Sequence, residues 1–161
     1  MTLERFKKKD YKKLMGADDC ETNQNHIILE FVDFDFTPDL ITDKLELQPQ
    51  STGQKGDKYF IGNKNKISKI RECNHWNYEM KVNSNEFIGE IIDKFFKEII
   101  IPRLDLIKQF GQNCEIVRLT IVQYYYTGNN PGYVFEKEQI KILAAINAEV
   151  DMDIYCLCEE E

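Results

Sequence analysis

An amphipathic pattern between residues 87 and 100 is the feature that most restricts how this chain can fold. Large apolar side chains recur there at spacings of three and four residues: Phe87, Ile88, Ile91, Ile92, Phe95, Phe96, Ile99 and Ile100. That spacing gathers them on one side of an α-helix, as a stripe wide enough to cover a β-sheet. Asn83, with Glu86 three residues later, is expected to cap this helix. Pro102 is expected to kink it, and Gly111 to end it.

The sheet under this helix is predicted from segments in which apolar and polar side chains alternate. We expect strands at residues 26–36, 75–82, 115–126 and 150–158. The first segment changes phase near Phe31, which indicates a bulge or a strand that is apolar on both faces. In the second segment Trp76 shares a face with Tyr78, Met80 and Val82 and is expected to be buried.

The remaining segments complete the predicted order. Thr37-Pro38 is typical of a helix start, and that helix should end before Pro49. Residues 48–57 are expected to form an irregular loop, 58–61 a short strand and 63–74 a polar, mobile insertion.

Near the carboxyl end, the turn-like sequence 127–132 predicts a hairpin whose returning strand is 133–135. A helix at 137–146 should bury Ile140, Leu143 and Ala144. The predicted fold class is therefore α+β, with a mixed, mostly antiparallel sheet, helices packed on one face and the order β-α-β-α-β-β-α-β. We expect residues 1–24 to be a basic appendage and linker, and residues 25–161 to be a single domain.

Charge is distributed unevenly along the chain. The net charge is −7, yet residues 1–14 carry about +4, which leaves about −11 on the remainder. Such a body repels nucleic acid phosphates and anionic membrane surfaces, and it attracts basic proteins. The chain shows no apolar leader and no apolar run long enough to span a bilayer, so a cytoplasmic location is expected.

Several residues are candidates for binding or chemistry. Paired carboxylates occur in two strands, Asp33 with Asp35 and Asp151 with Asp153, and would suit a cation or acid–base work if they converged. Tyrosines that flank the predicted turn are typical of a protein contact surface, or else they close the end of the core: Tyr124, Tyr125, Tyr126 and Tyr133.

Other patterns are weaker. The thiols Cys156 and Cys158 could form a zinc site with Cys73 and His75, but the spacing of these residues is unusual for zinc. On strand alternation both thiols share a face with Val150, Met152 and Ile154. We therefore expect them to be small core residues. The glycines of the segment 53–57 lack the following helix that a phosphate loop requires. Neither histidine lies in a nucleophile motif. We therefore expect no metal, no cofactor and no catalytic residue.

At the level of motifs, the chain resembles the bacterial domain-of-unknown-function family numbered 4279. The resemblance extends from Ile27 to Tyr155, and its motifs follow in order: Phe36-Thr37-Pro38, Ile41-Thr42, Leu45-x-Leu47-x-Pro49, Gly56-Asp57, Trp76, the long helix with Pro102, and a final Asp-x-Asp-x-Tyr strand. Glu136 stands where this family usually has Ser or Thr before the last helix. The segment 61–74 and the basic N-terminal segment also differ from the family. The resemblance implies a compact α+β domain and carries over no catalytic residues.

The expected function is that of a non-enzymatic protein-binding domain, with an immunity-type inhibitor of a basic toxin as one form. The expected contact residues are the four tyrosines and the four aspartates named above. Two alternatives stay open: a small-molecule binding module with a pocket between the sheet and the segment 61–74, and a carboxylate-dependent enzyme. A deep pocket with convergent polar groups would favour these alternatives, whereas a flat acidic face would favour protein binding.

Overall fold

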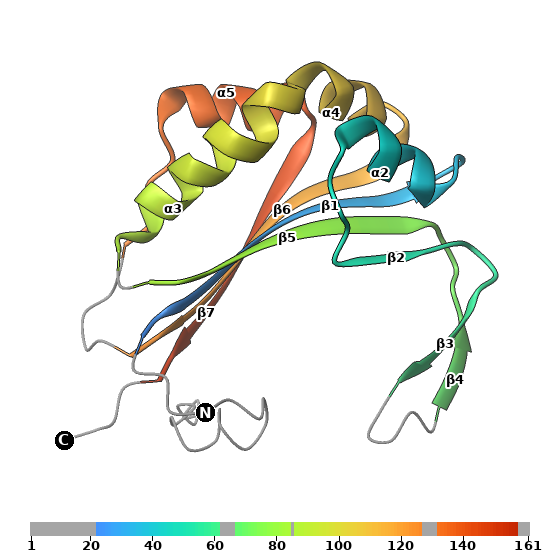
Figure 1. Ribbon diagram of the computed structural model, residues 1–161, viewed down its shortest axis with the longest axis horizontal. Helices are drawn as coiled ribbons and strands as arrows, with labels where there is room; N and C mark the ends of the chain where they lie inside the picture. Colours follow the sequence, from blue (N-terminus) through green and yellow to red (C-terminus); the bar gives the residue numbers. More distant parts are fainter. Residues whose placement is uncertain (1–21, 62–66, 85, 127–131, 158–161) are drawn as a thin grey trace.

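The computed structural model describes residues 22–61, 67–84, 86–126 and 132–157 (Figure 1). Its main sheet has the strand order β2-β5-β1-β6-β7. The strands are β1 (Gln24–Phe34), β2 (Ser51–Gly53), β5 (His75–Asn83), β6 (Cys114–Tyr125) and β7 (Ala148–Cys156). Neighbouring strands are antiparallel except for β6 and β7, which are parallel.

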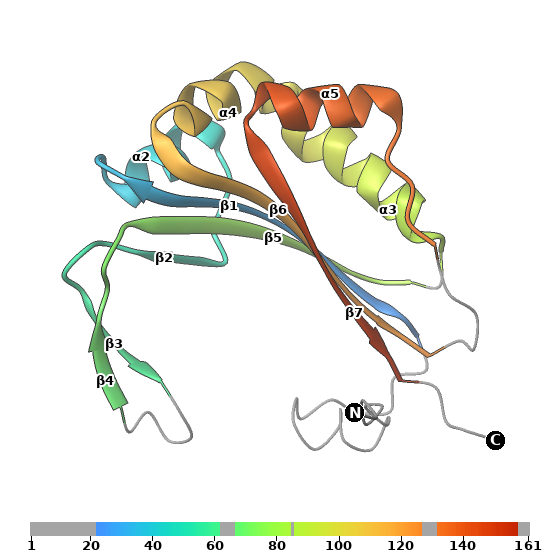
Figure 2. The same ribbon diagram turned by 180° about the vertical axis from the view of Figure 1, so that it is seen from behind.

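The helices α2 (Pro38–Leu45), α3 (Ile88–Phe95), α4 (Leu104–Gly111) and α5 (Lys137–Ala145) all lie on one face of this sheet (Figures 1 and 2). A separate hairpin of β3 (Lys58–Ile61) and β4 (Ile67–Ile70) projects from the other side, below β2 and β5. The predicted α+β class, with a mostly antiparallel sheet and helices on one face, is confirmed.

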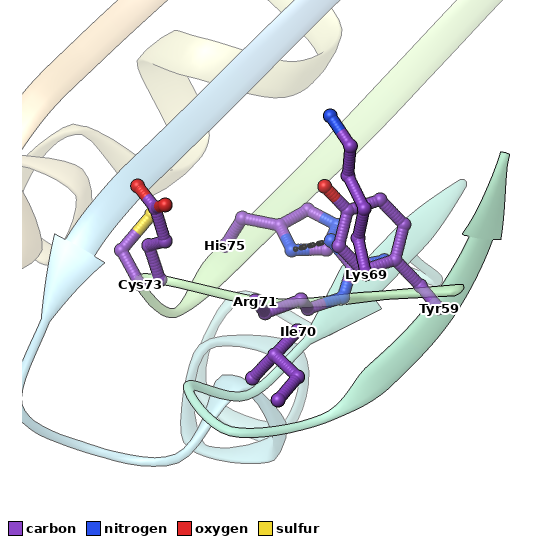
Figure 3. A pocket seen from close by; sticks show the side chains of 7 residues that line it. Tyr59, Lys69, Ile70, Arg71, Cys73 and His75 are labelled. Carbon is purple, nitrogen blue, oxygen red and sulfur yellow. Dashed lines mark hydrogen bonds between the residues drawn. The ribbon is translucent and has the colours of Figure 1, made fainter. Parts of the chain in front are cut away.

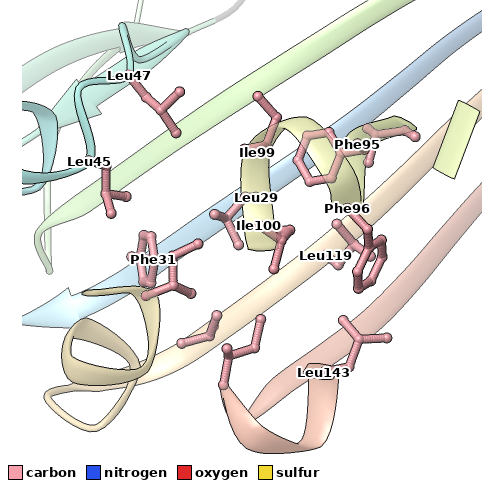
Figure 4. Packing of buried hydrophobic residues seen from close by; sticks show 14 of the residues in the cluster. Leu29, Phe31, Leu45, Leu47, Phe95, Phe96, Ile99, Ile100, Leu119 and Leu143 are labelled. Carbon is pink, nitrogen blue, oxygen red and sulfur yellow. The ribbon is translucent and has the colours of Figure 1, made fainter. Parts of the chain in front are cut away.

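The core lies between the helices and the middle of the sheet. Strand β1 is the central strand and pairs with β5 on one side and β6 on the other. Its alternate residues Ile27, Leu29 and Phe31 are fully buried. Figure 4 shows Leu29 and Phe31 among the side chains that pack between the sheet and the helices. Burial of each such side chain contributes about 1.5–3 kcal/mol to folding.

The expected change of phase in β1 occurs at Asp33. This residue has a φ of 56°, in the left-handed region that non-glycine residues seldom adopt. The residue after it, Phe34, returns to the core and stacks on Phe36. An aspartate tolerates this conformation better than most residues do, which explains why the kink falls there and not at Phe31.

The long apolar pattern forms a broken helix. After α3, residues Phe96–Ile100 form a π-helical turn and Ile101–Arg103 a 3₁₀ turn, and α4 follows. Pro102 explains the break, because it has no N–H to donate to the carbonyl of Glu98 four residues earlier. Arg103 compensates: its Nη1 donates to the carbonyl oxygens of Glu98 and Ile99 at 3.0 and 3.3 Å.

The same Arg103 side chain ties the broken helix to α2. Its Nε donates to the carbonyl oxygen of Leu45 at 2.6 Å. Leu45 is the last residue of α2, and the last carbonyl groups of a helix have no partner within the helix. One half-buried guanidinium therefore satisfies carbonyl groups at two interrupted helix ends.

Two helix predictions are wrong in detail. Asn83 does not cap α3, because β5 continues through Asn83 and Phe87 takes the cap position. In α5 Ile140 and Ala144 are exposed, whereas Gln139 is buried. Gln139 completes a capping box with Glu136 and donates from Nε2 to Asp93 Oδ1 of α3 at 2.6 Å, so a polar contact fixes the helix.

The strand predictions also need correction at three places. Residues 133–135 form no strand, and most of the predicted turn before them lies outside the described residues. Ser51–Gly53, predicted as loop, is the edge strand β2 paired with β5. Ile67–Ile70, predicted as part of a polar insertion, is β4 and pairs with β3, whose bounds were predicted correctly. The detailed order therefore differs from the predicted one.

We expect Trp76→Ala to lower the free energy of unfolding by about 3–5 kcal/mol, measured by urea denaturation, because a fully buried ring would be replaced by a cavity. Trp76 packs on Phe31 at 5.7 Å between ring centroids and donates from Nε1 to Thr42 Oγ1 at 3.0 Å. Thr42→Val is the matched control: it keeps the packing, leaves the indole N–H unpaired and should cost about 1–3 kcal/mol. A loss below 1 kcal/mol for Trp76→Ala would contradict this assignment.

Candidate functional site

Strand β7 forms one edge of the main sheet and exposes apolar side chains. Among the described residues it pairs only with β6, so the backbone groups on its outer side face no further strand. Val150, Met152 and Ile154 are 39%, 42% and 46% exposed. The register places Val150 beside Leu119 and Met152 beside Ile121, so these side chains continue the core face beyond the cover of the helices.

The prediction that this face of β7 is core is therefore wrong. Cys156 is half-buried, and Cys158 lies outside the described residues. His75 is the first residue of β5 and Cys73 lies just before it, and β5 is three strands away from β7 in the sheet. Among the described residues no group of three or more His, Cys, Asp or Glu side chains could hold a metal ion.

The opposite face of β7 carries acidic side chains. Glu149, Asp151 and Asp153 alternate with the apolar residues and are all exposed. Glu149 pairs with Arg118 at 3.3 Å, and Arg118 also pairs with Glu30 at 3.5 Å. Asp151 and Asp153 form no ion pair with any described residue, so their charges face solvent.

The two predicted carboxylate pairs do not converge. Asp151 is opposite Thr120, which in turn is opposite Ile28 of β1. Asp33 lies five residues further along β1 than Ile28, which corresponds to about 17 Å of strand. Asp35 follows the end of β1, further away still, and both are exposed. The sheet thus separates Asp33 and Asp35 from Asp151 and Asp153, and no shared acid–base or cation site results.

The predicted tyrosines gather at the end of the sheet where β6 ends. Tyr124 stacks on Tyr155 at 4.8 Å between ring centroids, on the face away from the helices. The backbone of Tyr125 accepts a hydrogen bond from Leu157, and that of Tyr126 donates one to the Asn23 side chain. All of these rings are partly buried.

Tyr133 lies on the helix side of the sheet and has an internal role. Its hydroxyl donates to Gln123 Oε1 at 2.7 Å, and Gln123 Nε2 donates to Asn25 Oδ1 at 2.7 Å. Burial, with a smaller contribution from Tyr125, raises the pKa of Tyr133 to about 12. The hydroxyl therefore stays protonated and joins the segment before α5 to the core.

A concavity of about 560 Å³ lies at the base of the β3–β4 hairpin, and we refer to it as the hairpin pocket (Figure 3). It is lined by Tyr59, Lys69, Ile70, Arg71, Glu72, Cys73 and His75. Most of these residues fall in the segment predicted as a mobile insertion, so the sequence analysis missed this pocket as a set of residues. It did anticipate a pocket between the sheet and that segment as one alternative.

Arg71 and His75 are hydrogen-bonded inside the hairpin pocket. The Nη1 atom of Arg71 donates to Nδ1 of His75 at 3.0 Å, and the guanidinium lies over the Tyr59 ring at 4.8 Å from its centroid. Because a guanidinium only donates, Nδ1 of His75 must accept, and its proton resides on Nε2. Nε2 then donates to Ser51 Oγ at 3.3 Å.

This tautomer determines what the pocket can do. Burial, and next the positive charge of Arg71, lower the pKa of His75 below its ordinary value of 6.5, so the ring is neutral at pH 7. Nε2 already carries a proton and cannot accept one from Ser51. The Ser51–His75 contact is therefore not an activated nucleophile, and the pair supports binding chemistry.

Gly53 makes room for Arg71. A Cβ at Gly53 would lie 2.2 Å from Nε of Arg71, closer than atoms can approach. The same glycine belongs to the segment 53–57, in which the structure shows no phosphate loop. Asp57 Oδ2 accepts the backbone N–H of Gln54 at 2.8 Å, and a strand follows in place of a helix.

Comparison with known proteins gives one match. The family described as Domain of unknown function (DUF4279) matches residues 23–157. No curated protein and no solved structure matches the chain. In the described part of the chain, no helix combines the length and the apolar character needed to cross a membrane.

We expect the pKa of His75, followed by NMR titration of its ring protons, to lie below 6.5 and to rise in Arg71→Gln. The rise should be partial, because the burial of the ring, which is the larger cause, remains. Since the unfolded chain binds this proton more tightly, the contribution of His75 to stability is present above pH 6.5 and is lost as the pH falls below it. Lys69→Gln is the control and should change this pKa less than Arg71→Gln does. An unchanged pKa in Arg71→Gln would contradict the hydrogen-bond assignment.

Proposed function

This chain belongs to the DUF4279 family, and from that premise we propose that it is a non-enzymatic protein-binding domain that takes a basic protein on the outer edge of β7. The observation that carries the proposal is the edge position of β7, where residues 148–154 face no further described strand on their outer side and expose both apolar and acidic side chains. An immunity-type inhibitor of a basic toxin is one form that such a domain takes.

The edge of β7 suits a partner that adds a strand. An exposed sheet edge offers backbone N–H and C=O groups for pairing, and alternate side chains then supply specificity. Val150, Met152 and Ile154 offer apolar contact on one face of the added strand. Such exposed apolar edges favour association, which soluble proteins otherwise suppress.

Charge selects the partner. Residues 148–161 contain six acidic residues and no Lys or Arg. On the described part of this segment, Asp151 and Asp153 are exposed and unneutralised by any described residue. A strand with Lys or Arg opposite these carboxylates would be attracted, whereas an acidic one would be repelled. The carboxylates also discourage pairing between two copies of β7.

The enzyme alternative has less support, because the carboxylates that it requires are separated along the sheet. The small-molecule alternative has one specific observation in its favour, the hairpin pocket of about 560 Å³.

The test starts from affinity capture with the full chain, followed by measurement of binding kinetics with the captured protein. We expect a basic partner whose association rate falls as salt rises toward physiological strength, where the Debye length is about 8 Å. The double variant Asp151→Asn, Asp153→Asn keeps the side-chain shapes and should slow association by roughly tenfold. The matched control Asp39→Asn, Asp105→Asn removes two exposed charges from the helix layer and should leave the rate unchanged within about twofold.

Two outcomes would contradict the proposal. One is a tight partner whose association is insensitive both to salt and to the β7 substitutions. The other is the recovery of no protein while sedimentation shows self-association through β7, since the edge would then bind a second copy of this chain.

A further inference from the structure

We infer that the hairpin pocket binds a small organic or inorganic oxyanion, a carboxylate or phosphate group, with the Arg71 guanidinium as its principal donor. This site is separate from the β7 edge and does not depend on the function proposed for that edge.

The first argument is the unusual state of the Arg71 guanidinium. Arg71, Arg103 and Arg118 are the arginines of the described residues. Arg103 donates to three backbone carbonyl oxygens, and Arg118 pairs with two carboxylates. Arg71 differs from both, because no described oxygen accepts a hydrogen bond from its guanidinium.

A guanidinium that has only a structural role is expected to lie on carbonyl or carboxylate oxygens, as the other two do. A guanidinium has five N–H donors, and Arg71 uses one of them, on a neutral imidazole nitrogen. Glu72 also lines the pocket, yet it forms no ion pair with Arg71. The remaining donors have the planar geometry that binds a carboxylate or phosphate through two parallel hydrogen bonds.

The second argument is that the surroundings hold this guanidinium in place. The backbone N–H of Arg71 donates to the carbonyl of Asp57 and its carbonyl accepts from Gly56, both at 2.9 Å. The Tyr59 ring supports the guanidinium from one side, and His75, itself bonded to Ser51, fixes Nη1. The missing side chain at Gly53 leaves the space that the guanidinium occupies. A donor held in this way loses less entropy when a ligand binds.

The third argument is the local charge. Residues 58–71 contain five Lys and Arg residues and no acidic residue, in a chain whose net charge is −7. Lys69 lines the pocket together with Arg71. The described lining carries two positive side chains, Lys69 and Arg71, against one negative side chain, Glu72, and an excess of positive charge in a concave surface attracts anions. The volume of about 560 Å³ is within the range of small-molecule sites.

The test uses NMR titration of the full chain with inorganic phosphate and, separately, with citrate, at constant ionic strength set by chloride. We expect saturable shifts at Tyr59, Lys69, Arg71 and His75. Arg71→Gln should weaken the better of the two ligands at least tenfold. Arg118→Gln removes the same charge from the open face of the sheet, outside the pocket, and should leave binding within twofold.

Two further variants keep the inference falsifiable. Gly53→Ala retains Arg71 but forces its guanidinium out of position, and should weaken binding at least threefold. If the fluorescence of Trp76 shows that Arg71→Gln does not fold, Lys69→Gln replaces it. Lys69→Gln should weaken anion binding at least threefold. Shifts that do not saturate for either anion, or equal weakening in Arg71→Gln and Arg118→Gln, would overturn the inference. Phosphate binding alone would assign a phosphate-bearing ligand, and citrate binding alone a carboxylate.

Discussion

The contact between strand β1 and the helix layer is the interaction on which the rest of this structure depends. Ile27, Leu29 and Phe31 are fully buried, and β1 has hydrogen-bonded neighbours along both sides. The broken helix covers this row with its own isoleucines and phenylalanines (Figure 4). Because the cover is widest over the centre, the edges β2 and β7 receive the least of it. The exposed apolar side chains of β7 follow from this geometry.

The one-sided helix layer also decides where chemistry can occur. Apolar packing occupies the helix face, so charged and aromatic polar residues are left on the open face and at the edges, as with Arg118 between Glu30 and Glu149. Two of the places that this arrangement leaves for a ligand are the outer side of β7 and the base of the hairpin beside β2. At the hairpin, the shortness of β2 matters, because Gly53 ends that strand and leaves the space that Arg71 takes.

The sequence predicted what depends on local periodicity and failed where tertiary contacts decide. The stripe from Phe87 to Ile100 and the alternation around Trp76 identify helix and strand, because burial imposes the period. The sequence did not predict the strand Ile67–Ile70, because the segment is short and its Lys69 hides the alternation, and only pairing with β3 makes it a strand. Gln139 is buried in place of Ile140 because it donates a hydrogen bond to Asp93. Local periodicity could not predict this contact, since the two residues are 46 positions apart. The Arg71 site was missed for the same reason: its supports come from β2, β3 and β5.

The two proposed sites are electrostatically opposite and lie at different ends of one sheet. His75 of the hairpin pocket is on β5, and β7 is three strands away, or about 14 Å at the usual strand spacing. That distance exceeds the Debye length of about 8 Å at physiological ionic strength, so the acidic edge lowers the anion affinity of Arg71 only weakly. At low ionic strength the Debye length grows to about 30 Å, and the acidic edge would then oppose anion binding. The separation across the sheet therefore allows an acidic domain to attract a basic protein at one edge and an anion at the other under physiological conditions.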